Sequence, residues 1–167
     1  IMMKGKTNNK FQYFIVDFGS IHLIPTLCVY MALLPMIYAL TYPGNELNNL
    51  DILAAFLAIA AVIIQIISDQ QMFNFRKNIS KPETMKSGLW YYSRHPNYFG
   101  EILFWFSLFI FAMAANFNFA WLLIGTLIMY ALIAIASVSM MDERSLERRP
   151  DFKEYMDTTP AIFINVF

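Results

Sequence analysis

The segment Gly88–Glu101 holds the side chains of this chain that are best suited to chemistry or ligand binding. It reads Gly-Leu-Trp-Tyr-Tyr-Ser-Arg-His-Pro-Asn-Tyr-Phe-Gly-Glu and combines a guanidinium, an imidazole, an amide, phenols and a carboxylate. A long apolar stretch follows at once. Buried polar groups cost several kcal/mol, roughly 2–7 each, when nothing satisfies their hydrogen bonds. The segment therefore predicts a site where these groups meet one another, water or a polar ligand.

Two residues of this segment are predicted to share one face of a helix. Pro96 suits the first turn of a helix, because its missing N–H is no loss there. Asn97 and Glu101 then lie one turn apart. Glu101 precedes Ile-Leu-Phe-Trp-Phe, at or below the lipid boundary, and a carboxylate there is a functional-site candidate by default. A favourable interaction with the helix dipole is the alternative explanation.

A second set of polar residues comes before this segment. The apolar run that ends at Ile67 continues into a polar stretch that contains Asp69 and Arg76. These two residues are seven positions apart, so on a continuing helix they share one face. They indicate either a polar stripe that lines a cavity or a helix end that passes into water, and both interpretations stay open.

Apolar helices must position these polar segments. Hydrophobic residues make up 58% of the chain and charged residues only 14%, whereas soluble domains carry about a quarter charged residues. Four apolar blocks are each near the ~20 residues that cross a bilayer as a helix: Ile21–Leu40, Ile52–Ile67, Tyr98–Ala115 and Ala120–Val138. The predicted fold is a single all-α integral membrane domain over residues 1–167, with about four transmembrane helices and an amphipathic C-terminal segment.

The basic residues predict the topology. All 12 Lys and Arg lie before the first span, between the second and third, or after the fourth (Lys4, Lys6, Lys10, Arg76, Lys77, Lys81, Lys86, Arg94, Arg144, Arg148, Arg149 and Lys153). With four spans, these segments share one membrane face, which the positive-inside rule makes cytosolic or matrix-like. Anionic lipid headgroups are the expected partners of this face, and no nucleic acid is expected.

The end of the chain is predicted to return to the polar segment. Only Asn116–Asn118 separates the third span from the fourth, which predicts a tight antiparallel hairpin. The hairpin places Asp142, Glu143 and Arg144 beside the segment Gly88–Glu101. An amphipathic tail on the membrane surface is the alternative interpretation of these charges.

The polar motifs resemble a known family. The pattern Arg-His-Pro-Asn-Tyr-Phe-Gly-Glu after Gly-Leu-Trp, with Glu-Arg-Arg-Pro-Asp-Phe-Lys-Glu-Tyr and Thr-Thr-Pro-Ala-Ile-Phe-Ile in the tail, is similar to the steroid 5α-reductase C-terminal family. That superfamily also includes sterol reductases and isoprenylcysteine carboxyl methyltransferases. The resemblance covers about residues 65–167 and corresponds to the cofactor-binding half of the reductases.

The resemblance implies an NADPH site. The reductases use NADPH and the methyltransferases use S-adenosylmethionine, and the pairing of Asn97 with Glu101 is typical of the reductases. An amide and a carboxylate suit a carboxamide and ribose hydroxyls, while Arg76 and Arg94 suit phosphates. The cofactor-binding residues implied by the resemblance are Asp69, Arg76, Tyr92, Arg94, His95, Asn97, Tyr98, Glu101, Asp142 and Glu143. No metal site is expected.

The substrate side is not located in the sequence. The reductases carry, in earlier helices, a carboxylate and a tyrosine that polarise the carbonyl of an enone, but only one span precedes Ile52 here. Tyr30 and Tyr38 lie in that span and are more typical of helix packing. Catalytic residues therefore stay unassigned.

Three functions fit these features. The first is an NADPH-dependent membrane reductase of a lipid or steroid-like enone, with a lipophilic small molecule as substrate. The second is a non-catalytic accessory subunit of a larger membrane complex, without a cofactor. The third is an S-adenosylmethionine-dependent methyltransferase of the isoprenylcysteine type, against which Glu101 counts. The expected location is the endoplasmic reticulum or an organellar membrane such as the mitochondrial inner membrane.

Overall fold

A computed structural model describes residues 14–15, 17–42, 46–78 and 83–162. In this part of the chain four helices are long and apolar enough to cross a membrane: Phe18–Thr41, Asn49–Asn78, Pro96–Ala115 and Phe117–Arg148. They contain the four apolar blocks read from the sequence. The prediction of an all-α membrane protein is confirmed.

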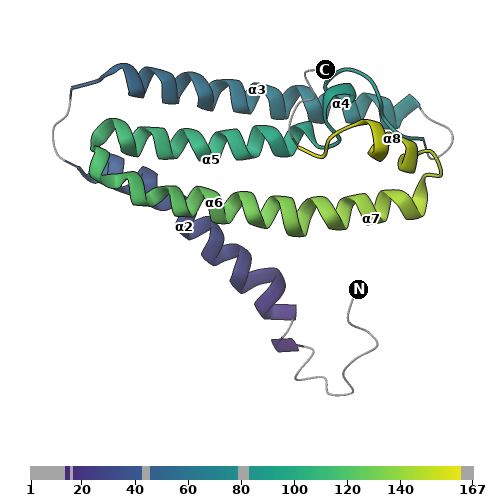
Figure 1. The fold of residues 1–167 in the computed structure, drawn as a ribbon, viewed down its shortest axis with the longest axis horizontal. Helices are drawn as coiled ribbons and strands as arrows, with labels where there is room; N and C mark the ends of the chain where they lie inside the picture. The colour runs from purple at the N-terminus through teal and green to yellow at the C-terminus, as the bar shows by residue number, and fades with distance from the viewer. Residues whose placement is uncertain (1–13, 16, 43–45, 79–82, 163–167) are drawn as a thin grey trace.

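The spans are built from the helical elements labelled in Figure 1. The first joins η1 (Phe18–Leu23) to α2 (Ile24–Thr41), the second is α3 (Asn49–Asn78), and the third is α5 (Pro96–Ala115), preceded by the short α4 (Leu89–Tyr92). The fourth runs through η2 (Phe117–Leu122), α6 (Leu123–Ala131), η3 (Leu132–Val138) and α7 (Ser139–Arg148), and α8 (Phe152–Thr158) follows. As predicted, α5 begins at Pro96.

Close packing of α3 on α5 brings their polar ends together. Gly100 of α5 lies against α3, where an added Cβ would be only 2.9 Å from the carbonyl oxygen of Ala61 and 2.8 Å from Cγ of Gln65. Ala61 is fully buried. This contact sets the start of α5 beside the middle of α3, and because the two helices run antiparallel, the C-terminal turns of α3 extend past the start of α5.

The first span crosses the others obliquely. Figure 1 shows α3, α5 and the α6–α7 rod side by side, while the N-terminal half of α2 leaves the bundle. At the crossing, Gly125 of α6 meets the backbone of α2, and an added Cβ would lie 2.3 Å from the carbonyl oxygen of Met31. The neighbouring Ala32 has no exposed surface. Small residues thus allow the close approach of α2 and α6.

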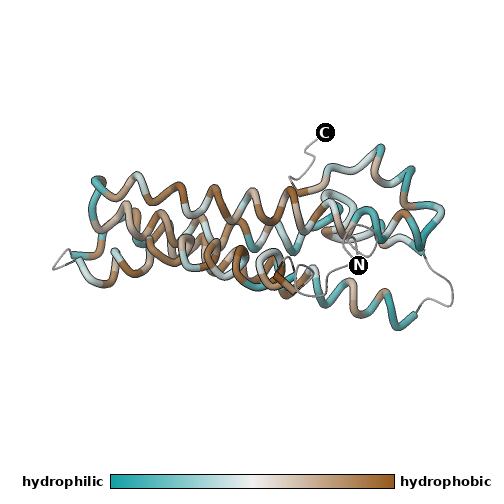
Figure 2. Tube along the Cα trace, turned by 90° about the horizontal axis from the view of Figure 1, so that it is seen from below, coloured by the Kyte–Doolittle hydropathy of each residue, from teal (hydrophilic) through white to brown (hydrophobic). Residues whose placement is uncertain are grey.

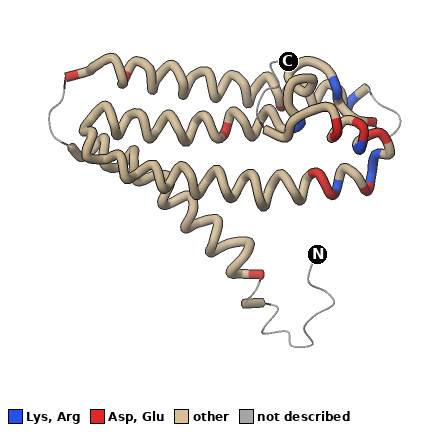
Figure 3. The backbone as a smooth tube through the Cα atoms, viewed as in Figure 1, with Lys and Arg blue, Asp and Glu red and all other residues tan. Residues whose placement is uncertain are grey.

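Charge and hydropathy separate along the bundle. Figure 2 shows apolar residues along its length and hydrophilic ones toward its ends, and Figure 3 shows the described Lys and Arg gathered at one end. Lys4, Lys6, Lys10 and Lys81 lie outside the described residues. Large apolar side chains point outward along α3, such as Phe56 and Ile66. Such surfaces contact lipid.

Candidate functional site

A cavity of about 440 Å³ lies at the basic end of the bundle. It is bounded by the C-terminal part of α3, the start of α5, α7, α8 and the segment before α4. Its lining includes the predicted site residues Asp69, Arg76, Arg94, His95, Asn97 and Tyr98, together with Met72, Phe73, Thr84, Met85, Trp90, Met141, Ser145, Arg149, Phe152 and Tyr155. The structure therefore brings together polar residues from both stretches identified in the sequence.

Helix α3 contributes one face to this cavity. Asp69, Met72, Phe73 and Arg76 all line it, at the spacing of residues that share a helix face. The helix continues to Asn78, beyond the apolar run. Asp69 and Arg76 line the cavity and are also exposed to solvent, so this stretch has features of both interpretations.

The segment before α5 is fastened to α3 by hydrogen bonds. Gln71 accepts a hydrogen bond from the backbone N–H of Leu89 at 2.9 Å, and the indole of Trp90 donates to the carbonyl of Ser68 at 3.1 Å. Gly88 permits this approach, because its φ is +63° and the Gln71 side chain lies where a Cβ would stand. These contacts fix where the following Arg-His-Pro residues lie.

Asp142 joins two neighbouring residues of the polar segment. Its Oδ2 accepts from Nη2 of Arg94 at 2.9 Å, and its Oδ1 lies 2.9 Å from Nε2 of His95. All three side chains are largely buried, with exposed fractions of 11%, 9% and 9% for Arg94, His95 and Asp142. The His95 ring also stacks on Tyr98. The predicted return of Asp142 to this segment is confirmed.

Arg94 also binds the end of the described chain, Tyr155–Ile162, which we term the C-terminal clasp. Its Nη1 donates to the carbonyl oxygens of Met156 at 3.0 Å and Thr159 at 2.7 Å. Its backbone N–H donates to Pro160 O at 2.9 Å. Most donors of this guanidinium thus serve the protein itself.

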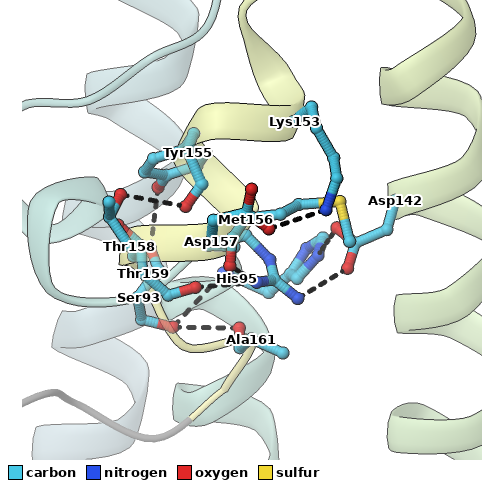
Figure 4. A network of polar contacts seen from close by, with 11 residues as sticks. Ser93, His95, Asp142, Lys153, Tyr155, Met156, Asp157, Thr158, Thr159 and Ala161 are labelled. Atoms are coloured by element: carbon cyan, nitrogen blue, oxygen red, sulfur yellow. Dashed lines mark hydrogen bonds and ion pairs between the residues drawn. The ribbon is translucent and has the colours of Figure 1, made fainter.

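Further contacts extend the clasp, as the network in Figure 4 shows. The N–H of His95 donates to Ala161 O at 3.0 Å, and Ser93 Oγ donates to the same oxygen at 3.1 Å. The Tyr155 hydroxyl donates to the carbonyl oxygen of Trp90. Burial raises the pKa of the Tyr155 hydroxyl above its ordinary value, with Arg94 opposing the shift and Asp142 adding to it. Tyr155 therefore stays a neutral donor.

Two side-chain donors, one in the polar segment and one in the middle of α5, have no partner. Nε of Arg94 and Nε1 of Trp105 are buried without a hydrogen bond among the described residues. Buried polar groups are almost always paired in folded proteins. Arg94 lines the cavity, but its Nε has almost no exposed surface, so this atom is closed off from the cavity by the surrounding protein.

The other predicted residues lie outside the cavity lining. Tyr92 is 47% exposed and lines a separate, shallower depression beside Lys86. Glu143 is exposed on α7. Glu101 is half-buried one turn further along α5 than Asn97. A role for any of the ten residues in cofactor binding stays a prediction.

Arg149 is a cavity residue that the sequence did not single out. It is half-buried where α7 ends. Burial and the charges of Arg76 and Arg148 lower its pKa, while Asp151 opposes the shift. In the sequence, Arg149 is one of two adjacent arginines before Pro150, and nothing in the sequence indicates which of the two faces the cavity.

Thr84, which lines the cavity, is bound to Asp151. Asp151 accepts hydrogen bonds from the hydroxyl of Thr84 at 2.9 Å and from its N–H at 3.2 Å, and it lies 3.6 Å from the Lys86 ammonium. Burial opposes ionisation of Asp151, but the Thr84 bonds and Lys86 outweigh it, so the pKa of Asp151 lies below its ordinary value. This pair joins the segment before α4 to the start of α8.

Comparison with known proteins gives a family and one distant relative. The family model described as a protein of unknown function (DUF1295) matches residues 3–159. An uncharacterized protein of Schizosaccharomyces pombe, C594.04c, is 26% identical over an alignment of 182 residues, gaps included. The alignment covers 92% of this chain and 51% of that protein. The chain thus spans about half the length of this curated relative. No solved structure matches the chain.

Proposed function

We propose that this chain, which belongs to the DUF1295 family of proteins of unknown function, binds NADPH and serves the reduction of a lipid or steroid-like enone. The cofactor and the reaction class come from the resemblance of its motifs to the steroid 5α-reductase C-terminal family. Because the chain spans about half of its curated relative, the proposal concerns the cofactor site. Substrate-polarising residues are assigned to no position.

The composition of the cavity is the observation that carries this proposal. Asp69 and Arg76 from α3 line the same space as Asn97 and Tyr98 from α5. They offer a carboxylate, a guanidinium, an amide and a phenol, which match ribose hydroxyls, phosphates and a carboxamide. S-adenosylmethionine has no phosphate, so the cations in the lining favour NADPH.

Arg94 holds the wall of the cavity in place. Its Nη atoms donate to Asp142 and to the C-terminal clasp, and its Nε is buried without a partner among the described residues. When bound, NADPH supplies the hydride, and the protein supplies binding and orientation.

Glu101 is assigned to the deep end of the ligand. It lies one turn beyond Asn97 on α5 and precedes the uncharged remainder of the span. Glu101 lies outside the cavity lining, and its assignment to the ligand rests on the resemblance of the Asn97–Glu101 pairing to the reductases. Replacement of Glu101 by Leu is therefore expected to abolish NADPH binding, whereas a methyltransferase would be little affected.

The proposed location is the endoplasmic reticulum or an organellar membrane. The basic end of the bundle (Figure 3) is assigned to the cytosolic or matrix-like face by the positive-inside rule. This orientation opens the cavity to the compartment that holds soluble cofactor.

Thermal unfolding of the purified protein tests the function. A ligand at a hundred times its Kd stabilises a protein by about 2.7 kcal/mol, so saturating NADPH is expected to raise the melting temperature of the wild type and not that of Glu101→Leu. A shift with S-adenosylmethionine and none with NADPH would instead support the methyltransferase. No shift with either, in a protein that purifies with stoichiometric partners, would support an accessory subunit.

A further inference from the structure

Two arginines from different parts of the chain converge on the cavity. Arg76 lies in the last turns of α3, and Arg149 follows the last residue of α7; both line the cavity. The backbone of Arg149 is fixed, since its N–H donates to Ser145 O at 2.9 Å and its carbonyl accepts from Phe152. The turn between α7 and α8 thus fixes the backbone from which the Arg149 side chain reaches the cavity lining.

Neither arginine has an ion-pair partner among the described residues. The ion pairs there join Lys86, Arg94, His95 and Lys153 to carboxylates. Asp151, the acidic group that most affects Arg149, is occupied by Thr84 and Lys86. Asp69 shares the lining but lies outside ion-pair distance of both arginines. Two positive charges therefore face one cavity without an ion pair; Arg76 is exposed to solvent and Arg149 is half-buried.

This arrangement is unfavourable for the protein alone. Burial and the charge of Arg76 both lower the pKa of Arg149, which means that its charged form is disfavoured where it stands. Uncompensated charges of this kind are typical of binding sites, where they cost stability. An anion between the two guanidinium groups would reverse the repulsion.

We propose that Arg76 and Arg149 form a two-arginine site for a phosphoryl or diphosphate group, and that Arg94 is a positioning residue rather than a phosphate ligand. Guanidinium groups bind phosphate oxygens with paired N–H donors, and both have donors to spare. Three contacts of Arg94 go to Asp142 and the C-terminal clasp instead.

The phosphoryl group has two possible sources. Under the proposed function it belongs to NADPH, and the inference rests on that function for the name of the ligand. A phospholipid headgroup at the same membrane face offers the same chemistry. The arginine pair is tested without either assumption by inorganic pyrophosphate.

The experiment measures pyrophosphate binding to the full chain in phosphatidylcholine nanodiscs. The wild type is expected to bind saturably, and Arg76→Gln and Arg149→Gln are each expected to weaken binding about 10-fold or more, as for lost hydrogen bonds between charged groups. Arg148→Gln is the matched control, since Arg148 adjoins Arg149 but is exposed and outside the cavity lining. It should bind as the wild type does.

Stability without ligand separates a binding role from a structural one. Arg149→Gln relieves the repulsion with Arg76, so its melting temperature should equal or exceed that of the wild type. A lower melting temperature together with unchanged pyrophosphate affinity would assign Arg149 to the fold and overturn the proposal. Absence of wild-type binding, or an equal loss in Arg148→Gln, would overturn it as well.

Two further arms identify the source of the phosphoryl group. Nanodiscs with added phosphatidic acid weaken pyrophosphate binding if a lipid headgroup occupies the arginine pair, and leave it unchanged if the ligand is soluble. NADPH competes with pyrophosphate if the cofactor is the ligand. Pyrophosphate binding without NADPH competition would support the arginine site and contradict the proposed function alone.

Discussion

Asp142 is the shared acceptor of Arg94 and His95. Its two carboxylate oxygens each hold one of these side chains at 2.9 Å, and little of the three side chains is exposed. When one member of such a group is removed, the others stay buried without a partner for their charge. This loss destabilises the folded protein by more than the intact group stabilises it. Asp142 therefore links α7 to the polar segment without itself lining the cavity.

Replacement of Asp142 by Asn is expected to lower the free energy of unfolding by about 3 kcal/mol, because it removes the charge opposite Arg94 in a largely buried site. Chemical denaturation in a mild detergent measures the change. Glu143→Gln alters the exposed neighbouring carboxylate and should leave stability unchanged. Equal stability of Asp142→Asn and wild type would show that the network contributes nothing to the fold.

Asp151 predicts a dependence of stability on pH. Because its pKa is lower in the folded protein than in the unfolded chain, its contribution is present above the ordinary carboxyl pKa and is lost as the pH falls through the lowered value. Asp151→Asn should therefore be less stable than the wild type at neutral pH, by about 1 kcal/mol or less for so exposed a group. The difference in unfolding free energy between Asp151→Asn and the wild type should disappear in acid.

The control for this titration is Asp157→Asn. Among the described residues, Asp157 forms an ion pair only with the exposed Lys153 on α8, so its replacement should change stability very little at any pH. A difference between Asp151→Asn and wild type that persists unchanged in acid would contradict the assignment.

At the scale of helices, the crossing of α2 over α6 depends on Gly125. Gly125→Ala places a Cβ 2.3 Å from the carbonyl oxygen of Met31, so backbone must move, at a cost of about 1–3 kcal/mol for such overpacking. Denaturation of the variant measures the loss. Gly19→Ala is the matched control, because nothing lies within 4 Å of its added Cβ. Equal effects of the two substitutions would contradict the close crossing.

Local patterns in the sequence were sufficient to predict the membrane spans and the start of one helix. The apolar blocks predicted the four spans, and Pro96 predicted the start of α5. The brief hairpin at Asn116 predicted the return of Asp142 to the polar segment, because an antiparallel pair of known length fixes where its ends meet.

The C-terminal clasp could not be predicted in this way. Its partners for Arg94 and His95 are backbone carbonyls, which every residue carries, so no residue type marks them. The sequence therefore suggested phosphate as the partner of Arg94, whereas the structure gives it protein partners. Likewise, the inward direction of Arg149 depends on the turn between α7 and α8 and not on its own residue type.

For the whole molecule, the gathering of basic residues at one end predicts the orientation in the membrane. In a background where Cys28 is replaced by Ala, thiol labels that do not cross membranes should reach Lys77→Cys and Lys153→Cys from the same side, and Glu46→Cys from the opposite side. The reason is that α3 separates Glu46 from Lys77. Labelling of all three variants from one side would contradict a spanning α3.

The central claim is that the cavity between α3, α5 and α7 holds NADPH. The most direct test is an experimental structure of the protein prepared with saturating NADPH. Cofactor density is expected in this cavity, with phosphates at Arg76 and Arg149 and the nicotinamide end toward Asn97. Density for NADPH elsewhere, or a cavity that stays without it while S-adenosylmethionine enters, would contradict the account.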